Sequence, residues 1–141
     1  MITFTTIDID LPIKVDFNKI RNWLVGLINE EGKTLGEINY VFCNDSYLHK
    51  INLEFLQHDT LTDIITFPTT NDSEIISSDL FISVDRIMEN SELLKLDLNS
   101  EFLRVIVHGI LHLLEYDDKT EKQILLMREK ENTYISKFKN I

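Results

Sequence analysis

Four stretches of the chain have the hydrophobic pattern of strands: the second and fourth alternate strictly between hydrophobic and polar residues, the first is mixed with β-branched threonine, and the third is a short hydrophobic run. Pro68 closes the third stretch, and residues 71–74, which precede the fourth, have the composition of a loop. The hydrophobic positions of the four predicted strands are Ile2, Phe4, Ile7 and Ile9; Ile38, Tyr40 and Phe42; Ile64, Ile65 and Phe67; and Leu80, Ile82 and Val84.

Hydrophobic residues that recur every three or four positions predict five helices between and after these strands. The first extends from Phe17 to Ile28, and the second contains Leu48, Ile51, Leu53 and Phe55. A short third helix reaches about Leu96, a fourth covers residues 101–115, and a fifth contains Ile124 to Phe138. Residues that accept hydrogen bonds from free amides mark the starts: Asp16, Asn44 to Ser46, Asp85, Ser100, and Thr120 with Gln123.

The predicted order of elements is β-α-β-α-β-β-α-α-α. Strands that pair early and helices that gather late favour the α+β class, with a mixed four-stranded sheet packed against about five helices. The chain contains no repeat, linker or low-complexity segment. Its 141 residues therefore suit one domain over residues 1–141.

One polar stripe crosses the otherwise apolar helix 101–115. It consists of Glu101, Arg104, His108, His112 and Glu115. Residues four apart lie one turn above each other on a helix, so the two histidines can converge on one metal ion. Their spacing therefore predicts a metal site at the end of a buried helix.

A third protein ligand can come from the acidic pair that follows this helix. A turn after Glu115 can bring Asp117 or Asp118 back over the stripe, which leaves an open coordination position. Gly109 weakens the helix, so a packing neighbour or a substrate must approach closely there. Gly109 also stands where the HExxH motif has its glutamate, so the general base of that motif is absent. The alternative is a solvated histidine stripe that binds no metal.

The formal net charge of −10 argues against a protein that coats nucleic acids nonspecifically. Residues 119–141 are mildly basic, with six basic and three acidic side chains, and a solvated helix face explains them best. Cys43 is the only cysteine, and we interpret it as a small core residue. The N-terminus has no signal-peptide pattern, and no apolar run is long enough to span a bilayer. We therefore expect a cytoplasmic protein without a membrane partner.

Three ordered segments resemble the YbeY family. Residues His108 to Asp118, HGILHLLEYDD, resemble the signature HGxLHLxGYDH. Asn52 to Pro68 resembles a second block, with a threonine-aspartate pair before its hydrophobic strand. Ser78 to Ser83, SDLFIS, resembles a third, G-D-I-x-I-S. Together the resemblance covers most of residues 35–130.

The resemblance implies an α+β fold with its metal in a cleft, and His108, His112 and position 118 as the ligands. It also implies a zinc-dependent, single-strand-specific endoribonuclease, in which another divalent transition metal can replace zinc. Family members act in maturation of the 16S rRNA 3′ end and in ribosome quality control. The expected partners are therefore single-stranded or ribosomal RNA and the ribosome.

Five positions depart from the family pattern. Asp118 stands where the third ligand is usually histidine, which makes a bound metal about one charge unit less positive and favours harder ions. Leu56 replaces an arginine that suits phosphate binding. Glu115 and Ser78 replace glycines, and Leu61 replaces a proline; we interpret these as local loop adjustments.

Two further residues are candidates for catalysis beside His108. Arg104 can meet a phosphate, or alternatively pair with Glu101 or a strand carboxylate. Asp79 can support a ligand imidazole, or alternatively serve as a turn residue at a strand end. Thr62 and Asp63 can line the cleft. The remaining aromatic and imidazole side chains have structural interpretations: His49 and His58 at the surface or in packing, and Trp23 in the core.

Two other functions fit the sequence. One is a metal-dependent hydrolase of another substrate, such as a small phosphoester or a peptide. The other is a ribosome-assembly factor with weak or no catalytic activity. Asp118 and Leu56 are the features that favour them.

Overall fold

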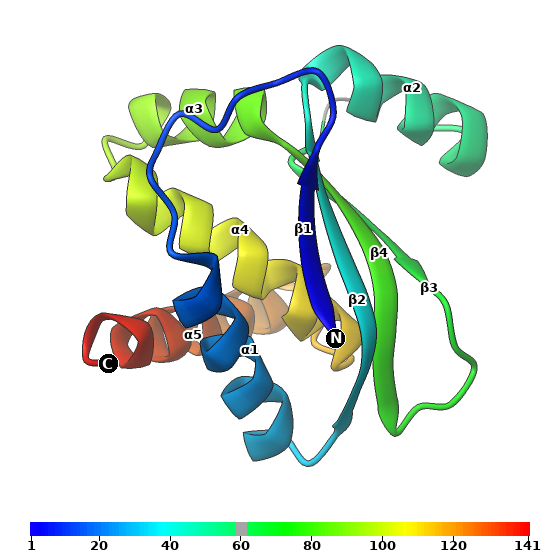
Figure 1. Ribbon diagram of the computed structural model, residues 1–141, viewed down its shortest axis with the longest axis vertical. Helices are drawn as coiled ribbons and strands as arrows, with labels where there is room; N and C mark the ends of the chain where they lie inside the picture. The colour runs from blue at the N-terminus through cyan, green and yellow to red at the C-terminus, as the bar shows by residue number, and fades with distance from the viewer. Residues whose placement is uncertain (59–61) are drawn as a thin grey trace.

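The computed structural model describes residues 1–58 and 62–141. Its elements are β1 (Ile2–Thr6), α1 (Phe17–Glu30), β2 (Thr34–Cys43), α2 (Asp45–Leu56), β3 (Ile64–Pro68), β4 (Ile75–Ser83), α3 (Val84–Leu93), α4 (Leu98–Leu113) and α5 (Glu121–Lys139). This order confirms the predicted α+β class (Figure 1).

The four strands form one mixed sheet in the order β1-β2-β4-β3. β2 pairs in parallel with both β1 and β4, while β3 runs antiparallel to β4. Tyr40 lies opposite Leu80, and Leu80 lies opposite Thr66, so these three side chains share one face of the sheet. β3 is an edge strand, so one side of its backbone pairs with no other strand of this sheet. This side lies beside the candidate site.

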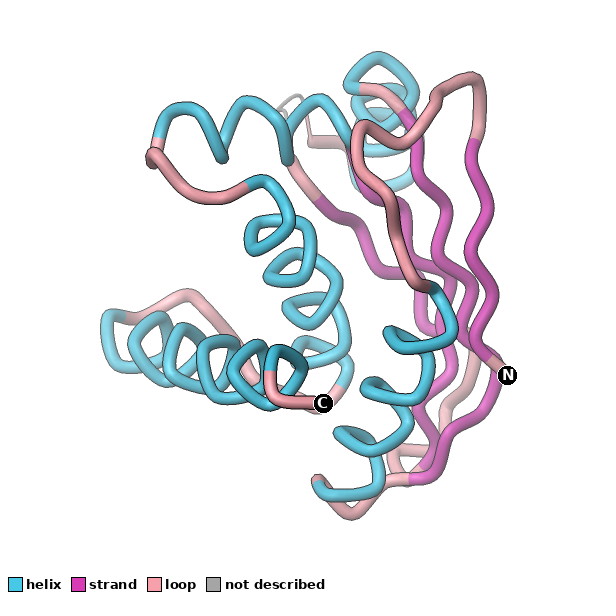
Figure 2. Tube along the Cα trace, turned by 60° about the vertical axis from the view of Figure 1, so that its left-hand side comes forward, coloured by secondary structure: helices cyan, strands magenta, loops and turns pink. Residues whose placement is uncertain are grey.

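Most helices lie on one side of the sheet (Figure 2). The main core forms between this side and helices α1, α4 and α5, and its fully buried residues include Leu24, Ile28, Ile38, Tyr40, Phe42, Leu80, Val107, Ile110 and Leu111. α2 packs on the opposite face, where Leu48 and Ile51 meet Cys43 and Ile65. Among the described residues, no helix has both the length and the apolar character to cross a lipid bilayer.

Several element boundaries differ from the sequence-based prediction. β1 ends at Thr6, so Ile7 and Ile9 lie outside the strand. α3 begins at Val84, because the Ser83 side chain accepts the amide hydrogen of Arg86 and takes the cap position predicted for Asp85.

α4 also begins earlier than predicted. The side chain of Asp97 accepts the amide hydrogen of Ser100 at 3.2 Å, so Asp97 is the cap and Ser100 lies inside the first turn. Two residues suited to capping stand three positions apart here, and the earlier one caps the helix. The helix therefore spans Leu98–Leu113 rather than residues 101–115.

Gly109 brings α4 close to the sheet. A Cβ atom at this position would lie 2.6 Å from both Ile64 Cδ1 and Leu80 Cδ2. The close approach expected at this glycine is therefore made by packing neighbours on β3 and β4. It fixes the polar stripe of α4 beside the β3 edge.

Candidate metal centre

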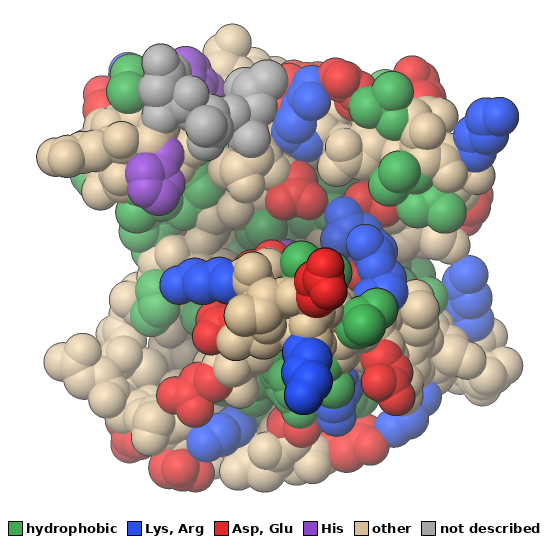
Figure 3. Space-filling view, turned by 180° about the vertical axis from the view of Figure 1, so that it is seen from behind, with side chains coloured by type: hydrophobic (Ala, Val, Ile, Leu, Met, Phe, Trp, Pro, Cys, Tyr) green, Lys and Arg blue, Asp and Glu red, His purple; other side chains and the backbone are tan. Residues whose placement is uncertain are grey.

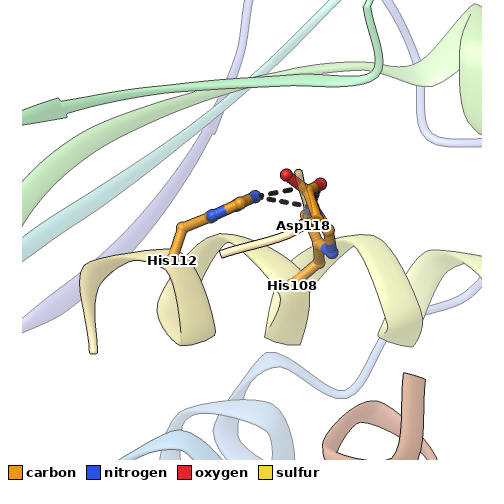
Figure 4. A group of neighbouring side chains, drawn as sticks. All are labelled: His108, His112 and Asp118. Carbon is orange, nitrogen blue, oxygen red and sulfur yellow. Dashed lines mark hydrogen bonds and ion pairs between the residues drawn. The ribbon is translucent and has the colours of Figure 1, made fainter. Parts of the chain in front are cut away.

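His108 and His112 lie one turn apart near the C-terminal end of α4. Their side chains are 14% and 27% exposed, so both are accessible from solvent on a helix whose neighbouring residues are mostly buried. Figure 4 shows the two imidazoles reaching out from α4 to the same point, where the Asp118 carboxylate meets them. The predicted convergence of the two histidines is thus present.

A tight turn after α4 returns the chain to this point. Glu115 adopts a left-handed backbone with φ of 74°, and the amide of Tyr116 donates to the carbonyl of Leu111 at 3.0 Å. This pattern ends a helix and reverses its direction. The Tyr116 hydroxyl donates at 3.1 Å to Glu31, the residue that caps the C-terminal end of α1, and this bond anchors the turn. Of the two aspartates that follow, Asp118 is the one that meets the histidines.

The three donor atoms have the spacing of a coordination site. His108 Nε2 and His112 Nε2 lie 2.9 Å apart, and Asp118 Oδ2 lies 3.6 Å and 3.5 Å from them. Two ligand atoms about 2.0 Å from one tetrahedral ion are separated by about 3.3 Å. Two imidazoles and one carboxylate also form a donor set that zinc uses in open, three-ligand sites. The residues therefore fit a divalent metal ion.

The other ring nitrogen of His108 contacts a residue that the sequence did not reveal. His108 Nδ1 lies 2.6 Å from Glu131 Oε2, and Glu131 on α5 is only 1% exposed. The sequence feature that could have pointed to Glu131 is its position on α5. Met127, Glu131 and Tyr134 form the buried face of that helix. A glutamate on a buried helical face requires a partner.

Arg104 lies beside the site but is held by carboxylates. Its Nε atom donates to both Glu101 oxygens at 3.0 and 2.9 Å, and its Nη2 atom reaches Asp63 at 3.4 Å. Burial alone would lower the pKa of Arg104, but these bonds and the charges of Glu101, Glu131 and Asp63 raise it overall. The ion pairs given as the alternative to phosphate contact are therefore formed.

Asp79 does not reach the histidines, which corrects the role expected for it. Successive side chains of a strand point to opposite faces, and Leu80 is the one that meets Gly109 of α4. Asp79 thus faces the other side of the sheet, where its carboxylate accepts a hydrogen bond from Asn39 at 2.9 Å. Glu131 holds the imidazole contact that was predicted for Asp79.

The histidines and Asp118 open into a cleft of about 620 Å³ between α2, β3 and α4. Its other lining residues are Asn52, Leu56, His58, Thr62, Asp63, Ile64, Ile65 and Thr66. Thr62 and Asp63 are thus at the cleft as expected, and His58 joins them as an exposed side chain. Leu56, 40% exposed, forms part of the wall. The space-filling view shows the surface hollowed across its middle, with acidic and basic side chains along the hollow (Figure 3).

Comparison with known protein families matches residues 5–139 to the family described as Endoribonuclease YbeY. This chain belongs to the YbeY family. The match spans nearly all of the sequence, so it includes the cleft, both histidines and the turn that carries Asp118. The resemblance inferred from three sequence segments is therefore confirmed.

Relatives in the YbeY family are similar over most of their length. A protein from Flavobacterium johnsoniae named Endoribonuclease YbeY is 50% identical over 117 residues, covering 83% of this chain and 84% of the relative. One of the same name from Flavobacterium psychrophilum is 43% identical over 138 residues, covering 98% and 96%. A solution structure of a Thermotoga maritima protein, 23% identical, matches with a TM-score of 0.65 over 98% of this chain and 89% of that one, which supports the fold.

The departures from the YbeY pattern have distinct positions in the structure. Glu115, at a family glycine, has the positive φ that suits glycine. Ser78 also stands where the family pattern has glycine. It is fully buried in β4, where its hydroxyl donates to the Asp79 carbonyl. Leu61 lies outside the described residues.

Proposed function

We propose that this protein is a metal-dependent endoribonuclease that cleaves single-stranded RNA. The observation that carries the proposal is the convergence of His108, His112 and Asp118 within 3.6 Å of one another. Its second support is the name Endoribonuclease YbeY, which relatives up to 50% identical carry. The domain that performs this function extends over residues 1–141.

A bound divalent metal lowers the pKa of water and polarises a phosphoryl oxygen, which suits attack on a phosphodiester. The two imidazoles and the Asp118 carboxylate would hold such an ion at the cleft. Arg104, fixed by Glu101 and Asp63, supports the wall of the site beside His108. The open cleft along β3 leaves room for a single strand of RNA.

We further propose zinc as the metal and ribosomal RNA as the substrate. Imidazole and carboxylate donors suit zinc, although the negative charge of Asp118 also widens the choice toward harder ions. Maturation of the 16S rRNA 3′ end, ribosome quality control and a cytoplasmic location rest on the family resemblance. The ribosome is accordingly the proposed partner.

One observation favours a second candidate function. Leu56 contributes an apolar side chain to the cleft wall where the family pattern has an arginine. Without that cation the cleft has one fewer phosphate contact, which suits a metal-dependent hydrolase of a less charged substrate or an assembly factor with weak activity. Restoring the cation distinguishes these alternatives, because Leu56→Arg should raise RNA cleavage roughly tenfold, the value of one charge-assisted phosphate contact.

The decisive assay compares three substrates: a single-stranded RNA, a duplex of the same RNA, and an unstructured peptide. We expect the zinc-loaded protein to cleave only the single strand, and His108→Ala to reduce cleavage at least 100-fold. Cleavage of the peptide alone would favour the other hydrolase. Zinc binding without cleavage of any substrate would favour the assembly factor.

A further inference from the structure

Glu131 is an acidic side chain on the buried face of α5. It is 1% exposed on the face of α5 that packs against α4, between Met127 and Tyr134. Removing a carboxylate from water costs several kcal/mol unless partners compensate for the lost hydration. The partners of Glu131 therefore indicate why a glutamate stands there.

The closest partner of Glu131 is a proposed metal ligand. Its Oε2 atom lies 2.6 Å from His108 Nδ1. Its Oε1 atom has no hydrogen-bond partner among the described residues, with Arg128 Nη1 at 3.5 Å and Arg104 Nη1 at 3.8 Å. Within the part of the chain that the structure describes, this buried carboxylate thus makes its one hydrogen bond to the imidazole.

That bond decides which nitrogen of His108 faces the cleft. A neutral imidazole carries one N–H, and a carboxylate at Nδ1 accepts it there. The lone pair is then on Nε2, the atom that lies 2.9 Å from His112 Nε2 and 3.6 Å from Asp118 Oδ2. The ring is thus held in the tautomer and orientation that a metal ion requires.

We propose that Glu131 is the positioning residue of the metal centre, which presents His108 Nε2 to the ion and makes metal affinity depend on the docking of α5. This inference rests on the metal site of the proposed function, but not on the substrate being RNA. Its effect reaches the ion through His108, since Glu131 itself is bonded on the side of the ring away from the ion.

The alternative is that Glu131 only attaches α5 to α4 by an ion pair. The distances favour positioning, because Arg104 directs its Nε and Nη2 atoms to Glu101 and Asp63 and leaves Nη1 beyond hydrogen-bond distance of Glu131. The Arg128 side chain is 52% exposed, and ion pairs of exposed side chains contribute little.

The test measures zinc affinity by competition with a chromophoric chelator, together with NMR of the imidazole nitrogens in the metal-free protein. The variants are Glu131→Leu, which removes the acceptor but keeps an apolar face, and Glu131→Gln, which keeps a neutral acceptor. The control is Glu129→Gln, because Glu129 is exposed on the same helix. Thermal denaturation of each variant establishes that it is folded.

Positioning predicts that Glu131→Leu binds zinc about 10- to 100-fold more weakly than wild type, with Glu131→Gln between them and Glu129→Gln unchanged. It also predicts that, in metal-free Glu131→Leu, the single N–H of the neutral His108 ring moves from Nδ1 to Nε2. If Glu131→Leu does not fold, Glu131→Gln still carries the test through its affinity. A folded Glu131→Leu variant that binds zinc as tightly as the wild type would overturn the proposal. If only Glu131→Gln folds, wild-type zinc affinity in that variant would overturn it. A wild-type protein that binds no zinc would overturn it as well. Zinc binding without RNA cleavage would overturn the proposed ribonuclease activity and leave this inference intact.

Discussion

Glu115 holds a backbone conformation that usually belongs to glycine. Its φ of 74° lies in the left-handed region, where a side chain costs roughly 1–2 kcal/mol. The family pattern has glycine at this position. Here the conformation is maintained by its neighbours, since Tyr116 donates both to Leu111 and to Glu31. The turn that brings Asp118 to the histidines is therefore formed despite local strain.

Glu115→Gly should stabilise the protein by about 0.5–1 kcal/mol. The relief of this backbone strain stabilises the fold, and the greater freedom that glycine gives the unfolded chain offsets part of that gain. Chemical denaturation with a fixed m-value measures the change. Glu115→Ala serves as the control, since it removes the charge but keeps the Cβ atom, and should give no comparable gain. Equal stabilisation by both variants would assign the effect to charge instead.

Single residues differed in how well the sequence predicted them. His108 and His112 were predictable because helical spacing alone puts them on one face. The acidic pair after the helix left Asp117 and Asp118 open as the third ligand, and only the family spacing favoured Asp118. Glu131 was not, because its contact depends on how α5 docks against α4. Asp79 was misassigned because the sequence did not establish which face of β4 meets the helices, and the structure turns Leu80 to α4 instead.

At the scale of elements, α4 contains Gly109, a residue of low helix propensity, at the point where the helix packs closely against the sheet. The pattern of apolar positions made the nine elements of the described residues predictable, whereas their ends depended on competition between nearby caps, as at Asp97 and Ser100. Gly109 illustrates the same limit. The sequence indicated a close neighbour, but only the packed sheet identifies it as Ile64 and Leu80.

Gly109→Ala should destabilise the protein by about 1 kcal/mol, because overpacking against two buried side chains exceeds the gain in helix propensity. Gly26→Ala is the matched control. Gly26 lies within α1, and a Cβ atom there meets nothing within 4 Å, so alanine should stabilise by about 0.5–1 kcal/mol. Thermal denaturation of both variants measures the difference, and equal shifts would contradict the packing role of Gly109.

At the scale of the whole molecule, the fold buries groups that lose protons at alkaline pH. Burial raises the pKa of the Cys43 thiol from 9.0 to about 12, assisted by the charges of Asp45 and Asp85. Burial also raises the pKa of Tyr40, whose hydroxyl donates to the Ile106 carbonyl at 2.8 Å. The folded protein therefore retains protons that the unfolded chain releases.

Stability should be unaffected by these groups below pH 9 and should fall as pH rises from 9 to 12. In that window the unfolded chain binds fewer protons, and each such group lowers stability by up to about 1.4 kcal/mol per pH unit. Cys43→Ala should be less stable at pH 8 but lose stability less steeply above pH 9. Urea denaturation at several pH values measures both slopes, and identical slopes would exclude Cys43 as a contributor.

The metal centre itself is tested most directly by elemental analysis of purified, tag-free protein after incubation with zinc and removal of the excess. We expect close to one zinc ion per chain in the wild type and in Asp117→Ala, whose substituted carboxylate lies outside the cluster. We expect almost none in the double variant His108→Ala, His112→Ala, and a clear loss in Asp118→Ala. Equal metal content in the wild type and the double variant, or no metal in either, would contradict the site formed by His108, His112 and Asp118.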